Sequence, residues 1–226
     1  MKVKILRQMT PFSEPYWESF DYNGPEDTTV AGMLTYINYN DDIVNDKGES
    51  VGRIGWECSC LQGVCGGCAM VINERPALAC NTFIRELESD VIEIRPLRKF
   101  PTVSDLVVDR SRIFEGLRDS DIYAAADNPR ANEDFEHRYL ASKCLKCGLC
   151  LEVCPNYGSG EVFYGAAFAN DCYLVYAADT SRTAEIKKEY DEHFGGYCSK
   201  SMSCMDVCPE GIPTLASMAK MNRARK

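Results

Sequence analysis

The sequence predicts an α+β fold in which a β-rich domain, residues 1–100, precedes a helical domain, residues 101–226. Short runs with the alternation of half-buried strands fill the first part of the chain. The later part has a helical pattern and contains two cysteine runs that each end in Cys-Pro. Pro96 and Pro101 mark residues 97–104 as the expected linker.

Each element of the first domain follows from a local pattern. The chain begins with an alternating strand that places Val3 and Ile5 on one face. Helix-start residues then precede an apolar stripe with the i, i+3, i+4, i+7 spacing of an amphipathic helix, formed by Val30, Met33, Leu34 and Ile37. Further strands are predicted at residues 17–22, 69–72, 77–80 and 91–94.

The composition excludes several classes of protein. The formal charge of −9 leaves no broad basic excess for binding nucleic acid. We find no signal peptide and no stretch that could span a membrane, so we expect a cytoplasmic chain. In a reducing compartment thirteen cysteines are expected to bind metal rather than form disulfides. The basic end of the chain, residues 220–226, is read as a solvated helix end, or else as a contact with anionic lipid or a partner.

The first cysteine group has the spacing C-x4-C-x2-C, followed by a fourth cysteine. Its members are Cys60, Cys65, Cys68 and Cys80. This is the plant-type ferredoxin spacing of a [2Fe–2S] cluster. Gly63, Gly66 and Gly67 are expected to take positive φ and aim N–H groups at the sulfurs. The alternative is a zinc site, which usually pairs C-x2-C with a second such pair.

Two further cysteine runs lie in the helical domain. The first has the bacterial ferredoxin form C-x2-C-x2-C-x3-C-P and contains Cys144, Cys147, Cys150, Cys154 and Pro155. The second has the same spacing with a serine at its second position and contains Cys198, Ser201, Cys204, Cys208 and Pro209. The fourth cysteine of such a run binds the other cluster. We therefore expect a [4Fe–4S] cluster on Cys144, Cys147, Cys150 and Cys208.

Ser201 leaves the remaining site with three thiolates, from Cys154, Cys198 and Cys204. A neutral hydroxyl is a poor iron ligand beside thiolates, so the third cluster is expected to be [3Fe–4S]. The alternative is a second [4Fe–4S] cluster with a serine or water ligand. Cys58 and Cys172 fall outside the three groups and are read as packing residues, as are His137 and His193.

The three cluster motifs in this order resemble those of the iron–sulfur subunit of succinate dehydrogenase and fumarate reductase. The resemblance covers nearly the whole chain and includes VCGGCAM at 64–70, ALAC at 77–80, DLVVD at 105–109 and CPNYG at 154–158. It implies a plant-ferredoxin-like β-grasp domain followed by an all-α, bacterial-ferredoxin-like domain. Asn156-Tyr157-Gly158 and Ser199 look more like the fumarate reductase branch.

The resemblance also implies partners. One is an FAD flavoprotein that holds the dicarboxylate active site, since this chain has no flavin fingerprint and no catalytic residues of its own. The other is a membrane anchor that binds quinone or haem b, on the cytoplasmic side of the cell membrane, with Pro155 near the quinone. Three alternatives remain: a subunit of a soluble, heterodisulfide-type fumarate reductase, a free ferredoxin-like carrier, and a zinc-binding interaction module.

Overall fold

The computed structural model describes residues 1–39, 41–125, 134–158 and 162–224. The chain divides into two compact units, Met1–Asp109 and Arg110–Lys226. Each unit is described by itself. Among the described residues, no helix combines the length and the apolar character that crossing a membrane would need.

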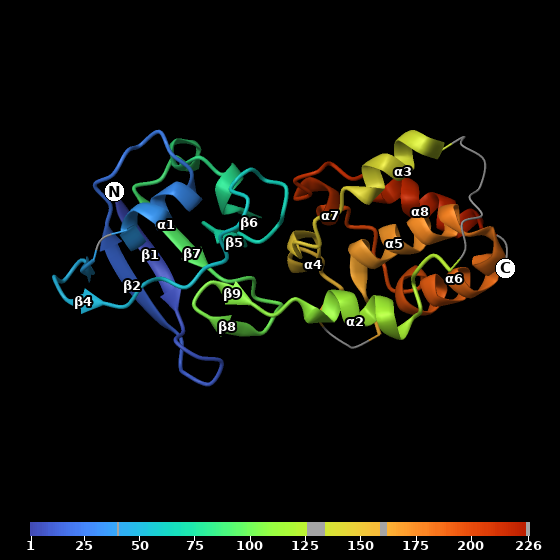
Figure 1. Cartoon of the computed structure of the whole chain (residues 1–226), viewed down its shortest axis with the longest axis horizontal. Coiled ribbons are helices and arrows are strands. Elements are labelled where there is room, and N and C mark those ends of the chain that lie inside the picture. Colours follow the sequence, from blue (N-terminus) through green and yellow to red (C-terminus); the bar gives the residue numbers. More distant parts are fainter. Residues whose placement is uncertain (40, 126–133, 159–161, 225–226) are drawn as a thin grey trace. The chain divides into compact units, whose positions relative to one another are not determined.

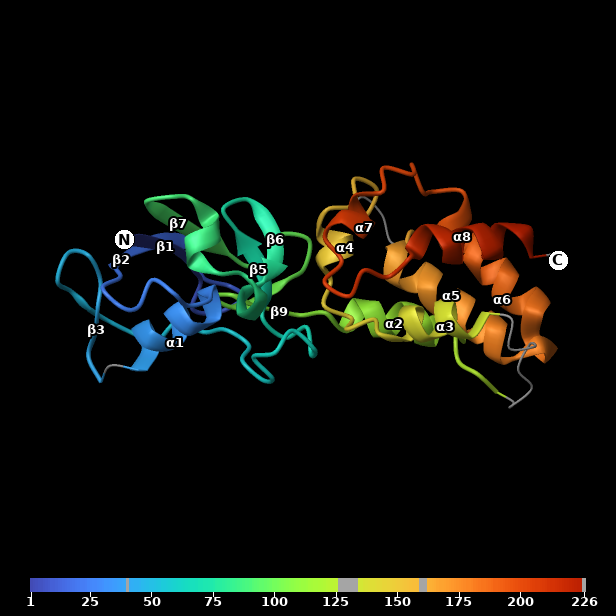
Figure 2. The same cartoon turned by 90° about the horizontal axis from the view of Figure 1, so that it is seen from above.

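The first unit is built on a five-stranded mixed sheet with the order β2-β1-β7-β5-β6 (Figure 1). Its strands are β1 (Lys2–Arg7), β2 (Tyr16–Asp21), β5 (Ala69–Ile72), β6 (Arg75–Leu78) and β7 (Val91–Arg95). β1 pairs antiparallel with β2 and parallel with β7. Helix α1 (Val30–Tyr39) lies across one face of this sheet (Figures 1 and 2). This arrangement is a β-grasp fold.

The predicted core stripes are buried. Val3 and Ile5 of β1 are fully buried, as β1 alternates between the core and the surface. On α1 the four residues of the predicted stripe, Val30, Met33, Leu34 and Ile37, are all buried. The apolar stripe therefore fixes which face of α1 meets the sheet.

Residues 97–104 do not form the predicted linker. Leu97 and Phe100 are buried, and the segment leads into a hairpin of β8 (Thr102–Ser104) and β9 (Val107–Val108). The Asp105 carboxylate at its turn accepts hydrogen bonds from the backbone N–H groups of Gln8 (2.9 Å) and Gly55 (2.8 Å). These bonds hold the hairpin against the end of β1. A second short hairpin pairs β3 (Ile43–Val44) with β4 (Ser50–Val51).

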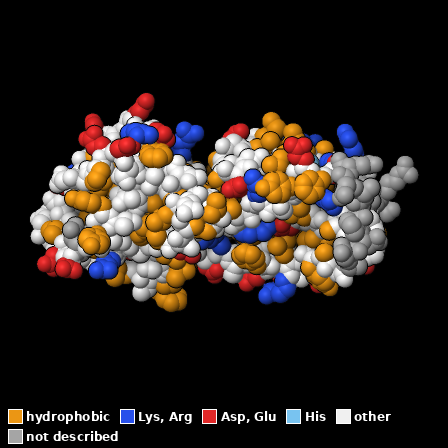
Figure 3. All heavy atoms as spheres, turned by 45° about the horizontal axis from the view of Figure 1, so that its top comes forward, with side chains coloured by type: hydrophobic (Ala, Val, Ile, Leu, Met, Phe, Trp, Pro, Cys, Tyr) orange, Lys and Arg blue, Asp and Glu red, His pale blue; other side chains and the backbone are white. Residues whose placement is uncertain are grey.

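The second unit is helical and is organised around α5 (Gly165–Ala178). The other helices are α2 (Ser111–Asp119), α3 (Phe135–Ser142), α4 (Leu149–Glu152), α6 (Thr183–Tyr190), α7 (Ser203–Asp206) and α8 (Thr214–Arg223). α5 is buried along most of its length and packs against α2, α3, α4, α6 and α8 (Figure 2). The predicted α+β fold class is confirmed. On the face drawn in Figure 3, basic, acidic and hydrophobic side chains are interspersed.

Candidate metal centres

The first cysteine group lies in the β-grasp unit. Cys60 and Cys65 belong to the loop that precedes β5, whereas Cys68 lies directly before β5 and Cys80 in the turn after β6. The pairing of β5 with β6 brings the last two together, since the Cys80 N–H donates to the Cys68 sulfur at 3.5 Å. Cys65 is exposed, but Cys68 and Cys80 are buried. One side of this group therefore faces solvent and the other faces the core.

Backbone N–H groups point at the sulfurs of this loop. The Gln62 N–H lies 3.4 Å from the Cys60 sulfur, and the Gly67 N–H lies 3.5 Å from the Cys65 sulfur. The bond from Gln62 and a hydrogen bond with Cys65 lower the pKa of Cys60 to about 7. Burial raises the pKa of Cys68 to about 12. N–H···S bonds of this kind stabilise anionic sulfur ligands, so the loop suits a bound cluster.

Two of the three glycines in this loop take the predicted backbone conformation. Gly63 has φ +76° and Gly66 has φ +75°, which an L side chain rarely adopts. Gly67 does not lie in the left-handed region, and Leu61 does instead, with φ +54°. A Cβ at Gly63 would come within 2.4 Å of the Asn81 side chain. The loop therefore needs glycine at positions 63 and 66. The prediction of a positive φ at Gly67 is wrong.

The second group joins the two distant cysteine runs. Cys144, Cys147 and Cys150 lie in the loop before α4 and on α4, and Cys208 lies just beyond α7. These four cysteines line one cavity, and Cys204 of the third group lines it as well. Burial raises the pKa of Cys147 to about 11, and the nearby Cys144 and Cys208 thiols add to this rise. The structure thus brings Cys208 beside the three cysteines of the first run.

The third group contains Cys154, Cys198 and Cys204. Burial raises the pKa of Cys204 to about 11, and the nearby Cys154 and Cys198 thiols add to this rise. The Lys200 N–H lies 3.4 Å from the Cys198 sulfur. Ser201 is exposed and accepts a hydrogen bond from the Ser203 hydroxyl at 3.4 Å. Cys154 of the first run therefore lies near Cys198 and Cys204 of the second.

The described cysteine sulfurs do not form a group with single-ion spacing. Thiolates that share one tetrahedral zinc at about 2.3 Å lie about 3.8 Å apart. All thirteen cysteines belong to the described part of the chain, yet no three of their sulfurs there lie within 4.8 Å of one another. Several metal atoms hold their ligands further apart than one ion does. The described cysteines therefore do not show the spacing of a single zinc ion held by three or more of them.

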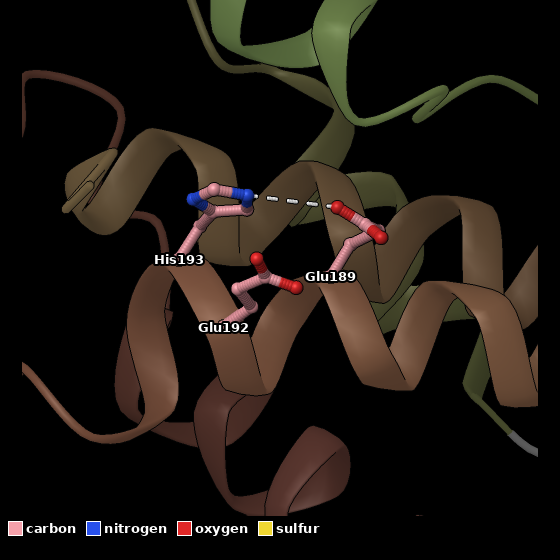
Figure 4. A group of neighbouring side chains, drawn as sticks. All are labelled: Glu189, Glu192 and His193. Carbon is pink, nitrogen blue, oxygen red and sulfur yellow. Dashed lines mark ion pairs between the residues drawn. The ribbon is translucent and has the colours of Figure 1, made fainter. Parts of the chain in front are cut away.

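Glu189, Glu192 and His193 are the one group of described residues with the spacing of a single-ion site (Figure 4). His193 stacks on Tyr164 with ring centroids 4.2 Å apart, and its Nε2 lies 3.6 Å from Glu189. Lys188 pairs with both carboxylates at 3.2 and 3.8 Å. The group is therefore a surface ion-pair network.

The cysteines outside the three groups occupy other places. Cys172 is fully buried in the centre of α5, where burial raises its pKa well above the usual value. Cys58 is exposed and lines a separate cavity beside the end of α1. His137 lies 2.9 Å from the Ser217 hydroxyl and packs on Tyr173.

Several contacts around the cysteine loops could not be predicted from the spacing of the cysteine motifs. Lys146, between two cysteines, has φ +53° and lies 2.5 and 2.6 Å from the carboxylate oxygens of Asp171. The Arg110 guanidinium donates to the Cys147 carbonyl at 3.4 Å. Both cations lie close to the second group. Positive charge there favours bound thiolates over free thiols.

Comparisons with known proteins identify both domains and the family. A family model described as a 2Fe-2S iron-sulfur cluster binding domain matches residues 2–115, and a 4Fe-4S dicluster domain matches residues 140–212. The succinate dehydrogenase iron-sulfur subunit of Bacillus subtilis is 37% identical, over 97% of this chain and 90% of its own length. The fumarate reductase iron-sulfur subunit of Wolinella succinogenes is 28% identical, over 93% and 90%.

A solved structure shows the same fold. A chain of the Mycobacterium smegmatis Sdh1 complex in the apo form has a TM-score of 0.77 and 24% identity, over 98% of this chain and 93% of its own. The fold and the cysteine groups together define a two-domain iron–sulfur electron-transfer protein. The chain belongs to the family of iron–sulfur subunits of succinate dehydrogenase and fumarate reductase, and it is the electron-transfer subunit of such an oxidoreductase.

Proposed function

We propose that this chain connects an FAD flavoprotein subunit, where succinate and fumarate interconvert, with a membrane anchor that binds quinone or haem b. The assembled complex would lie on the cytoplasmic side of the cell membrane, with this chain held there by its partners. Membership of the family supports the partners, since the relatives are named as subunits of these two enzymes. Pro155, directly after Cys154, is the residue proposed to lie near the quinone.

The ligands of the three clusters are proposed as four, four and three cysteines. Cys60, Cys65, Cys68 and Cys80 would bind [2Fe–2S], and Cys144, Cys147, Cys150 and Cys208 would bind [4Fe–4S]. Cys154, Cys198 and Cys204 would bind [3Fe–4S]. When bound, such clusters supply one-electron redox centres. The chain's own contribution is to hold the thiolates, to direct N–H groups at sulfur and to exclude water from the buried sides.

One observation carries the assignment in the helical unit. The Cys208 thiol adds to the raised pKa of Cys144, Cys147 and Cys150, although Cys204 also adds to that of Cys150, and Cys154 adds to that of Cys204. This proximity supports the proposal that each run lends its last cysteine to the other. Substitution can test this crossing. We expect Cys208→Ser to abolish the reduced [4Fe–4S] signal in EPR spectra while a three-iron signal persists. Cys154→Ser should have the converse effect, and loss of the same signal in both variants would refute the crossing.

The branch within the family is a finer question. We propose the fumarate reductase branch, supported by Asn156-Tyr157-Gly158 and Ser199. The higher identity with the Bacillus subtilis subunit supports the succinate dehydrogenase branch instead. Rates of quinol-driven fumarate reduction and succinate-driven quinone reduction by the purified complex decide between them. Faster succinate oxidation would overturn the branch proposal and leave the family unchanged.

Anaerobic purification of the native complex tests the proposed partners. The chain should copurify with a flavoprotein that contains FAD and with a membrane subunit that contains quinone or haem. Recovery as a single species of about 25 kDa would instead indicate a free carrier, because the chain itself has a mass of 25.3 kDa. A stable complex without a membrane subunit would indicate the soluble, thiol-linked enzyme.

A further inference from the structure

A cavity of about 250 Å³ opens between α3, α5 and α8 in the helical unit, among residues that none of the three cysteine groups uses. Three cationic side chains line it, from Arg138, Lys220 and Arg223, together with the Asp134 carboxylate. The cavity therefore carries a net positive charge in a chain whose formal charge is −9. Cations gathered in a concave site raise the local concentration of anions.

The charges in this cavity are arranged around one aromatic residue. Lys220 forms an ion pair with Asp134 and lies over the Tyr173 ring, 5.7 Å from its centroid. Lys220 and Arg223 both lie in the last turn of α8, whereas Arg138 belongs to α3. Two helices therefore bring positive charge to the cavity that Tyr173 also lines.

The Tyr173 hydroxyl is a buried hydrogen-bond donor. Tyr173 is 1% exposed, and its hydroxyl oxygen has no hydrogen-bond partner among the residues that the structure describes. Burial raises its pKa to about 12; the Asp134 charge raises it further and the Arg138 charge opposes the rise. The hydroxyl is thus protonated at neutral pH and lies near the charged groups of the cavity. A buried polar group normally has a partner, which an ordered water or a group of a bound ligand can supply.

We propose that this cavity binds a phosphate group, either as the free anion or as the headgroup of an anionic phospholipid. The guanidinium groups of Arg138 and Arg223 have the planar fork that matches phosphate oxygens, and Lys220 adds a point charge. The Tyr173 hydroxyl donates to a further oxygen. A phosphate group has enough oxygens to accept from all of these donors. This proposal does not depend on the direction of catalysis or on the cluster assignment.

The test uses the full chain, with its clusters reconstituted, and two probes. Inorganic phosphate is titrated by calorimetry, and flotation measures binding to vesicles of phosphatidylcholine with or without phosphatidylglycerol. Phosphate binding alone assigns the free anion, whereas binding only to vesicles that contain phosphatidylglycerol assigns the lipid headgroup. Failure to bind either probe overturns the proposal.

Variants distinguish specific binding in the cavity from nonspecific attraction of the anion to positive charge. Tyr173→Phe keeps the ring and removes the donor, so it should weaken binding about tenfold, as expected for a hydrogen bond to a charged group. Arg223→Gln should weaken binding by at least as much. Lys188→Gln removes one positive charge outside the cavity and should change affinity less than about twofold. Equal losses in Arg223→Gln and Lys188→Gln, with Tyr173→Phe unchanged, would show that only net charge matters and would overturn the proposal.

Discussion

The Ser199 hydroxyl donates a hydrogen bond of 2.7 Å to the side-chain oxygen of Asn156, and the Asn156 amide donates one of 2.8 Å to the Tyr197 carbonyl. Asn156 follows Cys154 by two residues, and Ser199 directly follows Cys198. This relationship therefore ties together two loops that carry proposed ligands of the three-iron site. It also joins the two positions on which the branch proposal rests.

Removal of this hydroxyl should loosen the third cluster site. In Ser199→Ala we expect the oxidised three-iron EPR signal to decay about two- to fivefold faster under air, as expected for the loss of one hydrogen bond. The matched control is Ser89→Ala, since Ser89 bonds only within its own exposed turn in the other unit. Equal decay rates in both variants would show that the Ser199–Asn156 bond does not stabilise the site.

The pair of Lys146 and Asp171 makes a prediction about pH. Both side chains are largely buried, with 20% and 12% exposed, so Lys146→Met leaves a buried carboxylate unpaired and should cost about 3 kcal/mol at neutral pH. Burial raises the pKa of Asp171 and Lys146 opposes this rise, so the pKa should rise further in the variant. A folded state that binds the extra proton loses stability as pH increases. The loss relative to wild type should therefore be smaller at about pH 5 than at about pH 8.

Urea unfolding of the helical unit at these two pH values measures the effect. The double variant Lys146→Met, Asp171→Asn is the control, because it removes both charges and should show little of the added pH dependence. A destabilisation of Lys146→Met that does not change with pH would contradict the account.

Alanine substitution of Gly63 tests the backbone of the [2Fe–2S] loop, and the same substitution at Gly52 is its control. Gly63 has φ +76° and Asn81 beside it, so Gly63→Ala should cost at least about 1 kcal/mol and reduce the [2Fe–2S] content after reconstitution. A Cβ at Gly52 would meet no atom within 4 Å, and its φ is not left-handed, so Gly52→Ala should retain the cluster. Visible absorption and iron content report the difference. Similar cluster loss in both would count against the conformational argument.

Arg7 should stabilise the β-grasp unit strongly. It is 1% exposed, lies 2.6 Å from Glu18 and 3.0 Å from Asp105, and donates to the Arg53 carbonyl at 3.0 Å. Arg7→Leu strands two buried carboxylates and should cost about 3–5 kcal/mol. Lys4 lies on the same strand as Arg7 and forms an exposed ion pair with Glu93 of β7, so Lys4→Leu should cost less than about 1 kcal/mol.

Tryptophan fluorescence in urea is the measurement for these two variants. Both tryptophans of the chain, Trp17 and Trp56, lie in the β-grasp unit, so their emission follows the unfolding of that unit. Equal unfolding midpoints for Arg7→Leu and Lys4→Leu would contradict the role given to Arg7.

The sequence predicts most of the fold because the relevant signals are local. The alternation around Val3 and the stripe that begins at Val30 specify a buried face within a few residues. The strand pair β8 and β9 has no such signal, because strands of three and two residues carry no alternation and the flanking prolines resemble a linker. The hairpin is held by Asp105, whose partners Gln8 and Gly55 are distant in sequence.

The candidate metal centres also combine local features, which the sequence predicts, with contacts between distant loops, which it does not. Ligand spacing within a cysteine loop is a local property, so the sequence indicates which cysteines are candidate ligands, and their division into three groups stays a prediction. Contacts between loops could not be predicted, because Ser199 and Asn156 are 43 residues apart and Lys146 and Asp171 are 25 apart. The prediction of a positive φ at Gly67 is wrong, and Leu61 of the same loop has a positive φ that was not predicted. The backbone of a ligand loop depends on packing as well as on its glycines.

The division of the cysteines into four, four and three depends on Ser201, and one comparison tests it most directly. EPR spectra and iron analysis of oxidised wild-type protein and of Ser201→Cys should be recorded side by side. The account predicts a three-iron signal in the wild type, its loss in the variant, and one additional iron per chain in the variant. An unchanged spectrum and iron content in Ser201→Cys would contradict the three-cysteine site.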